Sequence, residues 1–117
     1  MQERHPEALR IYRGNDPEAR IPGGESLCDC QRRVVTCLEA LAAERPTEDM
    51  VVVAHGGTLN AIVRHVLGIP LTAPRRFRLF NGSLNVFSRS PGQWRLDTWG
   101  DVAHLQAIGA LDNTVCL

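Results

Sequence analysis

The stretch that most constrains the fold runs from residue 50 to residue 58 and reads MVVVAHGGT. Its first five residues are apolar and mostly β-branched, which is typical of a strand buried on both faces in a parallel sheet covered by helices. Two adjacent glycines then allow a tight turn. Apolar residues recur at helical spacing over Leu59–Leu67, and Gly68 followed by Pro70 ends that pattern. The stretch predicts a buried strand over Met50–Ala54, a turn and a helix.

A long amphipathic helix is expected before this stretch. Ser26, with Asp29 three residues later, resembles a capping box in which Asp stands in for the usual Glu. Apolar residues then follow at three- and four-residue steps, and Pro46 stops the pattern. The members of this stripe are Leu27, Cys30, Val34, Cys37, Leu38 and Leu41. Helix, strand, turn and helix in this order indicate an α/β fold.

The remaining segments are shorter. Pro6–Arg13 predicts a short helix, and the proline- and glycine-rich Asn15–Gly24 predicts a loop. The C-terminal third predicts short strands separated by turns at Asn81-Gly82 and Ser90-Pro91-Gly92. These strands are Phe77–Phe80, Leu84–Phe87 and Trp94–Leu96, and Trp94 and Trp99 are expected to pack on the sheet or in the core. No repeat or linker divides the chain, so residues 1–117 are interpreted as one domain.

Charge and cysteine content argue against several functional classes. Thirteen basic residues balance thirteen acidic ones, so no global field favours nucleic acid or an anionic membrane as a partner. The basic cluster Arg75, Arg76 and Arg78 is interpreted as a solvated rim. No signal-peptide pattern occurs, and no apolar run approaches the roughly 18 residues of a membrane span, so we expect a soluble cytoplasmic protein. The cysteines, interpreted as reduced packed thiols without a metal, are Cys28, Cys30, Cys37 and Cys116.

His55 is the first candidate functional residue, because it ends the predicted strand and precedes the predicted helix. In open α/β sheets, ligands bind beyond the carboxyl ends of the strands. A helix start offers backbone N–H groups and a positive dipole end to an anion, and Gly56 and Gly57 allow close approach. An imidazole can donate a hydrogen bond to that anion. The pattern alone leaves two interpretations open: a phosphate or carboxylate subsite, or a strand end followed by an ordinary turn.

Three motifs in order resemble the second half of the histidine phosphatase superfamily, which includes cofactor-dependent phosphoglycerate mutases and alpha-ribazole phosphatases. They are PGGESL at 22–27, VVAHGG at 52–57 and NGSLNVF at 81–87, and DVAHL at 101–105 resembles the usual ending of the family. The likeness covers roughly residues 3–105 and is closest in style to the alpha-ribazole phosphatases. It implies a three-layer α/β/α sandwich, here a partial phosphoglycerate mutase-like domain that lacks its first central strand.

The resemblance also implies a mechanism. In this family a histidine of an Arg-His-Gly motif attacks the phosphoryl group and becomes a phosphohistidine, without a metal, and we expect no cofactor. His55 matches the second histidine, which hydrogen-bonds the transferred phosphate beside the backbone of Gly56 and Gly57. The implied substrate is a small phosphomonoester. A phosphatase is favoured over a phosphoglycerate mutase because the stretch after His55 is short.

The sequence departs from the family pattern at the nucleophile. It contains no Arg-His-Gly: Arg4-His5-Pro6 resembles the start of the short helix that follows the acid-bearing loop in the family, and Arg64-His65 lies inside the predicted helix Leu59–Leu67. We therefore expect these 117 residues to lack the nucleophilic histidine, two pocket arginines and the general acid. The alternative hypothesis is a catalytically incomplete remnant that binds an anion or a partner chain but catalyses no reaction.

The missing elements also affect the sheet. The family places the strand with the nucleophile beside the one that matches Met50–Ala54. Without that neighbour, this strand keeps unpaired backbone groups and bare apolar side chains. We expect a second copy, forming a homodimer, or a complementing chain to cover the exposed strand edge.

Two further residues are candidates for contact with the substrate. Glu25 lies in the glycine-rich loop before the long helix, and Ser83 lies at the start of a predicted strand. A simpler explanation for Glu25 is that it orders the start of the helix, and a simpler one for Ser83 is ordinary turn geometry. His5, His65 and His104 are assigned surface or capping roles.

Overall fold

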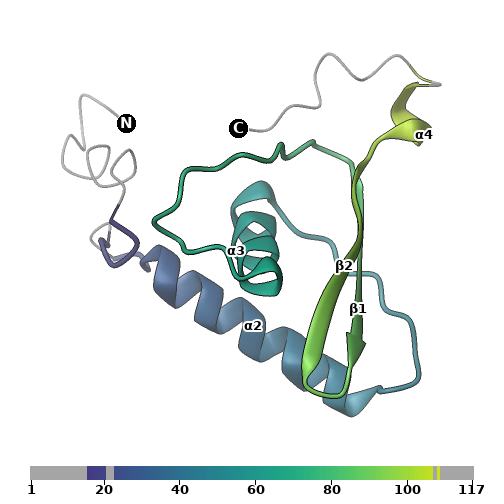
Figure 1. Cartoon of the computed structure of the whole chain (residues 1–117), viewed down its shortest axis with the longest axis horizontal. Coiled ribbons are helices and arrows are strands. Elements are labelled where there is room, and N and C mark those ends of the chain that lie inside the picture. Colours follow the sequence, from purple (N-terminus) through teal and green to yellow (C-terminus); the bar gives the residue numbers. More distant parts are fainter. Residues whose placement is uncertain (1–15, 21–22, 107, 109–117) are drawn as a thin grey trace.

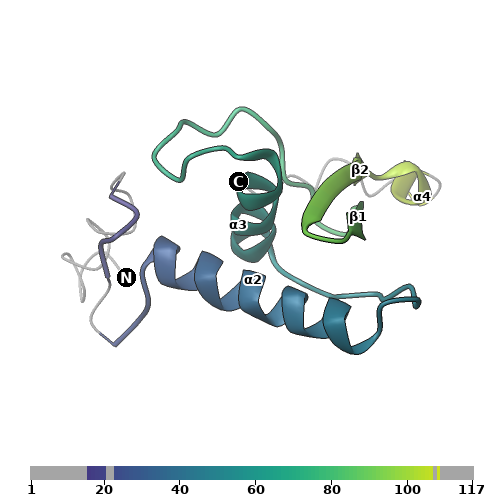
Figure 2. The same ribbon diagram turned by 60° about the horizontal axis from the view of Figure 1, so that its bottom comes forward.

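The computed structural model describes residues 16–20, 23–106 and 108. Its elements, in chain order, are α2 (Leu27–Glu44), α3 (Gly56–Leu67), β1 (Leu84–Ser90), β2 (Gln93–Asp101) and α4 (Ala103–Gln106). Figures 1 and 2 show α3 lying against α2, with the β1–β2 hairpin standing near the C-terminal end of α2. The predicted helix over Pro6–Arg13 lies outside the described residues. The described part contains no helix long and apolar enough to cross a membrane.

The long helix and its cap are confirmed. The Asp29 N–H donates to Ser26 Oγ at 3.0 Å, and the Ser26 N–H donates to Asp29 Oδ2 at 3.3 Å, which completes the reciprocal capping box. That bond from the Ser26 N–H holds the pKa of the Asp29 carboxyl below its ordinary value. Helix α2 then continues to Glu44, just before Pro46.

The second predicted helix is also confirmed, and its end has the expected chemistry. Gly68 adopts the left-handed conformation with φ 69°. Its N–H donates to His65 O, and the Ile69 N–H donates to Arg64 O at 2.8 Å, as in a Schellman motif. Position 68 therefore favours glycine because other L-residues rarely adopt this φ.

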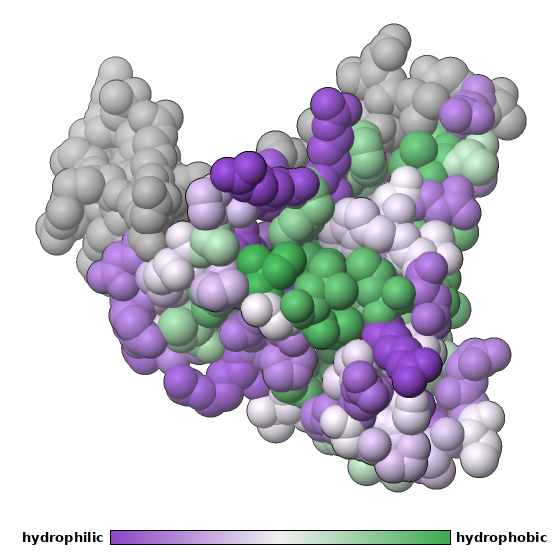
Figure 3. Space-filling model, in the orientation of Figure 1, coloured by the Kyte–Doolittle hydropathy of each residue, from purple (hydrophilic) through white to green (hydrophobic). Residues whose placement is uncertain are grey.

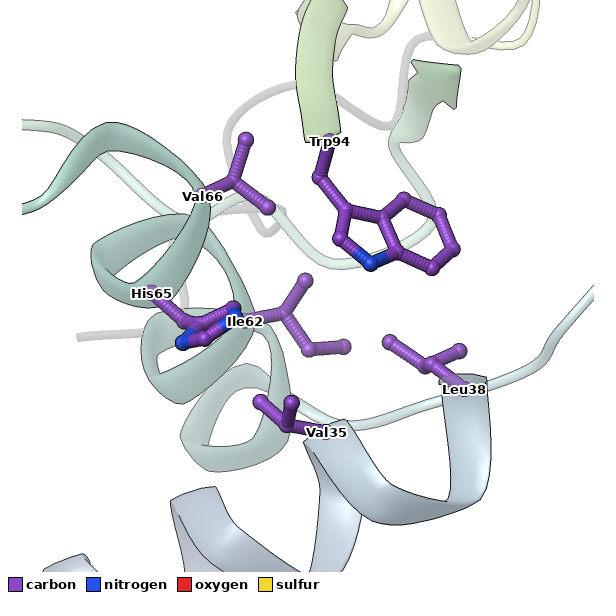
Figure 4. Close-up of a pocket in the computed structure, with 6 residues that line it drawn as sticks. All are labelled: Val35, Leu38, Ile62, His65, Val66 and Trp94. Carbon is purple, nitrogen blue, oxygen red and sulfur yellow. The ribbon is translucent and has the colours of Figure 1, made fainter. Parts of the chain in front are cut away.

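The core lies where α3 packs on α2. Its buried apolar residues are Val34, Ala61, Ile62, Val63 and Leu79. A narrow apolar crevice remains at the edge of this contact, where Val35 and Leu38 of α2, Ile62 and Val66 of α3 and the indole of Trp94 face one another (Figure 4). This packing buries consecutive residues of α3 from Ala61 to Arg64, but only Val34 of α2.

The β-hairpin confirms two of the three predicted C-terminal strands. Strands β1 and β2 pair antiparallel, from Leu84 opposite Asp101 to Ser90 opposite Gln93, and Gly92 forms the turn with φ 78°. Phe77–Phe80 was predicted to be a third strand, and this is wrong, since only Phe80 makes an isolated bridge. The segment contacts β2 through side chains instead: the Trp99 indole N–H donates to Arg78 O at 2.9 Å, and Phe77 meets the Trp99 ring edge-on.

The prediction of a buried strand over Met50–Ala54 is wrong. Val51 and Val53 are each 95% exposed, and no backbone hydrogen bond within the described part of the chain involves this segment. The sheet of the described residues is accordingly two-stranded and antiparallel, in place of the parallel sheet of a three-layer sandwich. The physical reason is that a strand forms only with a neighbour, and none of the described segments supplies one.

A polar cluster that the sequence did not predict joins the hairpin to α2. The Trp94 indole N–H donates to Glu39 Oε1 at 2.6 Å, and Arg89 pairs with Glu39 Oε2 at 2.7 Å. The Trp94 bond first, and Arg89 second, hold the pKa of the Glu39 carboxyl below its ordinary value. Trp94, expected to pack on the sheet or in the core, is half-buried and joins the hairpin to α2.

The thiol predictions hold in part. Cys28, Cys30 and Cys37 are free thiols, whereas Cys116 lies outside the described residues. Cys28 and Cys30 are half-buried, but Cys37 was expected to be packed and is exposed, because α3 covers only part of the apolar stripe of α2. The Glu18 carboxylate raises the pKa of the Cys28 thiol, which favours its protonated form.

Candidate functional site

His55 is the N-cap residue of α3. Its backbone is extended (φ −103°, ψ 167°), its side chain makes no capping hydrogen bond, and the residue is exposed. Its carbonyl already accepts the first helical bond, from the Leu59 N–H at 2.9 Å. The local sequence explains the geometry, because an extended apolar segment meets the first turn of a helix at this residue. The imidazole is therefore free to face a ligand from solvent.

The first turn of α3 presents the backbone of an anion site. The N–H groups of Gly56, Gly57 and Thr58 have no acceptor among the residues that the structure describes. A Cβ placed on Gly57 would meet nothing within 4 Å, so the approach to this turn is open. The turn carries no acidic side chain, so no carboxylate of its own competes for the positive end of the helix dipole. An anion can thus contact backbone donors and the imidazole together.

Glu25 lies at the start of the other long helix. Its carboxylate pairs with Arg33, whose Nη2 is 2.8 Å from Oε1, across the first turns of α2. The bond to Arg33 holds the pKa of the Glu25 carboxyl below its ordinary value. A carboxylate held in this way remains ionised, which suits ordering of the helix start better than donation of a proton.

Ser83 lies in the turn that precedes β1. The Ser83 N–H donates to Phe80 O at 3.3 Å, and the Asn85 amide donates to Ser83 Oγ at 3.2 Å. The Asn85 side-chain oxygen Oδ1 in turn accepts from the Gly100 N–H at 2.8 Å, which ties the turn to β2. These bonds give Ser83 and Asn85 a structural role at the base of the hairpin.

The structure places the candidates on separate elements. His55, Glu25 and Ser83 belong to the starts of α3, α2 and β1, and within the described residues no hydrogen bond or ion pair joins any two of them. The remaining histidines follow the surface assignment: His65 is exposed at the apolar crevice, and His104 Nε2 lies 2.8 Å from Gly82 O. His5 lies outside the described residues.

Arg64 is an important residue that sequence reasoning missed. It is only 4% exposed, and its guanidinium donates to Asn60 Oδ1 and to the carbonyls of Pro70 and Ala73. It also lies over the Phe77 ring, 5.7 Å from the centroid. Arg64 therefore holds the loop after α3 against that helix. A helical arginine gives no sequence signal for such a role, because its acceptors are backbone carbonyls.

Comparison with known proteins identifies relatives that match most of this chain. A metal-independent phosphoserine phosphatase of Arabidopsis thaliana is 34% identical over 110 residues, and phosphoglycerate mutase-like protein 4 of the same plant is likewise 34% identical over 110 residues. A probable phosphoglycerate mutase GpmB of Salmonella is 38% identical over 99 residues. These matches cover 93%, 92% and 77% of this chain.

The same matches cover only 44%, 46% and 44% of the relatives, so the chain spans less than half of their length. No solved structure matches it. The family model of the histidine phosphatase superfamily (branch 1) matches residues 1–102. The chain therefore belongs to the histidine phosphatase superfamily.

Proposed function

We propose that this chain supplies the phosphate-binding half of a metal-independent phosphomonoesterase that works through a phosphohistidine. The observation that carries the proposal is the exposed His55 imidazole beside the free N–H groups of the first turn of α3. Family membership adds the reaction class, and the similarity to a metal-independent phosphoserine phosphatase favours hydrolysis. A small cytoplasmic phosphomonoester, of the kind that alpha-ribazole phosphatases hydrolyse, is the proposed substrate class.

In this proposal His55 and the backbone of Gly56 and Gly57 hold the equatorial oxygens of the transferred phosphoryl group. Both donate hydrogen bonds to oxygens that gain charge during transfer, so they stabilise the transition state. The attacking nitrogen and the proton donor come from residues outside these 117. Glu25, paired with Arg33, and Ser83, held by Asn85, are weak candidates for contact with the substrate.

Two alternatives remain within the same family. Phosphoglycerate mutase activity is the first, since one relative is described as a probable phosphoglycerate mutase and another as phosphoglycerate mutase-like. The second is an incomplete remnant that binds an anion or a partner without turnover, and the absence of Arg-His-Gly from the sequence favours it for this chain alone. Metal-independent turnover of a phosphomonoester by the 117-residue chain, lost in His55→Ala, would exclude the remnant.

The test is a titration of the chain with inorganic phosphate, followed by the amide NMR signals of residues 56–58. We expect saturable shifts there, and a loss of about tenfold in affinity in His55→Ala, the size expected for one hydrogen bond to a charged group. His104→Ala is the matched control, because that exposed imidazole contacts Gly82 O and lies in another element. Shifts that are absent, or that persist unchanged in His55→Ala, would contradict the proposal.

A further inference from the structure

An open groove lies between the start of α2 and the loop that follows α3. Its volume is about 470 Å³, which is within the range of small-molecule sites. Apolar walls and polar groups both line it, among them Pro17, Cys28, Gln31, Arg64, Ile69 and Leu71. Figure 3 shows a mixed surface at the start of α2, with pale, green and purple residues, whereas a uniformly hydrophobic patch lies over α3 toward the hairpin. The groove therefore differs from the apolar contact of the two helices.

Arg64 gives this groove a buried positive charge, since the residue is only 4% exposed. Its Nε donates to Asn60 Oδ1 at 3.0 Å, and its Nη1 donates to the carbonyls of Pro70 and Ala73 at 2.7 and 2.8 Å. Within the described part of the chain, Nη2 has no acceptor and no carboxylate pairs with the guanidinium. Carbonyl oxygens carry only partial charges, so the described residues supply Arg64 with no full counter-charge.

The unpaired nitrogen of Arg64 is accessible to solvent. No side-chain nitrogen or oxygen of the described residues is buried without a partner, so Nη2 reaches the surface, and Arg64 lines the groove. Gln31 adds a fixed acceptor, because its Nε2 donates to Ala61 O at 3.0 Å and its Oε1 has no donor among the residues that the structure describes. Ala61 and Arg64 are three positions apart and share a face of α3. The groove thus combines a fixed cationic donor with a fixed neutral acceptor.

These groups select a singly charged organic anion. A guanidinium binds a carboxylate through charge-assisted hydrogen bonds, and Pro17, Ile69 and Leu71 can cover an apolar part of the same molecule. On the α2 side, the Glu18 carboxylate raises the pKa of the Cys28 thiol, so a negative charge already lies there and repels a second one. The negative end of the α3 dipole also faces the groove. An anion can therefore bind only where Arg64 offsets these charges.

We propose that this groove binds a small monocarboxylate, whose carboxylate accepts hydrogen bonds from Arg64 Nη2 and whose apolar part packs on the groove walls. The site is separate from His55, since it lies at the other end of α3, and a helix of 12 residues is about 18 Å long. The inference does not depend on the proposed function. The bound molecule contacts both α2 and the loop after α3, so it fastens that loop to the helix.

The experiment is a titration of the 117-residue chain with 3-methylbutanoate, followed by the amide NMR signals of residues 28, 31, 68, 69, 71 and 72. We expect saturable shifts at these residues. The neutral probe 3-methylbutanamide has the same shape without the charge, so it should bind about tenfold more weakly. His55→Ala should leave the affinity for 3-methylbutanoate unchanged, because His55 precedes the opposite end of α3.

Thr72 allows a test that leaves the fold intact, because it is exposed and lines the groove. Thr72→Lys should tighten binding of 3-methylbutanoate and Thr72→Glu should weaken it, by about two- to fivefold each, the size expected for one surface charge. A structural disturbance would not change sign with the charge. Thr36→Glu is the matched control, since Thr36 is an exposed threonine of α2 outside the groove, and it should bind as the unchanged chain does.

Several outcomes would overturn the carboxylate site. They are the absence of shifts at the groove residues, equal binding of acid and amide, and Thr72 variants that do not change the affinity in opposite directions. Shifts confined to residues 56–58, or binding lost in His55→Ala, would place the probe at the start of α3 instead. None of these outcomes bears on whether inorganic phosphate binds at His55, so the two proposals stand or fall separately.

Discussion

Two valines of the same chain provide a direct test of the burial pattern. Val63, on the inner face of α3, is 1% exposed, whereas Val53 is 95% exposed. Substitution of each by alanine removes the same two methyl groups. Any difference in the free energy of unfolding between the two variants therefore reports the environment of the side chain.

The expected magnitudes differ severalfold. For Val63→Ala, the lost transfer free energy is about 1.6 kcal/mol at about 0.8 kcal/mol per methyl-sized group. The cavity left beside α3 adds to this, so the cost is about 2–3 kcal/mol. Val53→Ala removes groups that already face water, and such surface changes stay within about 0.5 kcal/mol. A matched change at Val51 should behave as Val53 does, since it is equally exposed.

The assay is urea unfolding of the 117-residue chain and both variants, followed by circular dichroism at several protein concentrations. Val63→Ala should clearly lower the urea concentration at the midpoint of unfolding. The slope of the free energy of unfolding against urea concentration should not change. The reasoning would be refuted if Val53→Ala cost as much as Val63→Ala, because Val53 would then be buried in solution. A cost that grew with protein concentration would assign that burial to a second copy of the chain.

Two further predictions concern the contacts that shape the fold. Ser26→Ala removes the N-cap acceptor of α2, so we expect a loss of about 1 kcal/mol in the free energy of unfolding, measured by urea denaturation, while the exposed control Ser90→Ala should cost little. Because the pKa of Glu39 is lowered in the fold, its contribution to stability is complete above the ordinary value of 4.5 and is lost as the pH falls below it. Glu39→Gln should therefore flatten the acid branch of the stability–pH profile, and an unchanged branch would show that Arg89 and Trp94 do not stabilise the ionised form.

The helices could be predicted because their signals are local. Ser26 and Asp29 are close enough in sequence to cap α2 without help from the rest of the fold. Gly68 ends α3 for a similarly local reason, since the left-handed conformation is required there. The turn at Gly92 follows the same rule and fixes the hairpin. In each case the residue and its partner lie within a few positions of one another.

The strands show the limit of this reasoning. The β-branched run Met50–Ala54 correctly indicates extended, apolar chain, but composition contains no information on which neighbour pairs with it. The prediction of a strand over Phe77–Phe80 fails for a related reason. The Phe77 ring packs on Trp99, but the segment forms no strand of the β1–β2 sheet. The bonds of Glu39 to Arg89 and Trp94 span 50 and 55 positions, so no local pattern indicates them.

The site also combines local residues with residues that lie elsewhere. The free energies of binding show why the local residues alone cannot bind phosphate tightly. The start of an exposed helix contributes about 0.3–1 kcal/mol toward an anion, and one hydrogen bond to a charged group contributes about 1.5–3 kcal/mol. Their sum is at most about 4 kcal/mol, which corresponds to a dissociation constant near 1 mM. His55 and the first turn of α3 should thus bind phosphate only at millimolar concentration in the chain alone. Micromolar affinity needs about 8 kcal/mol, and therefore requires further donors in addition to His55 and the first turn of α3.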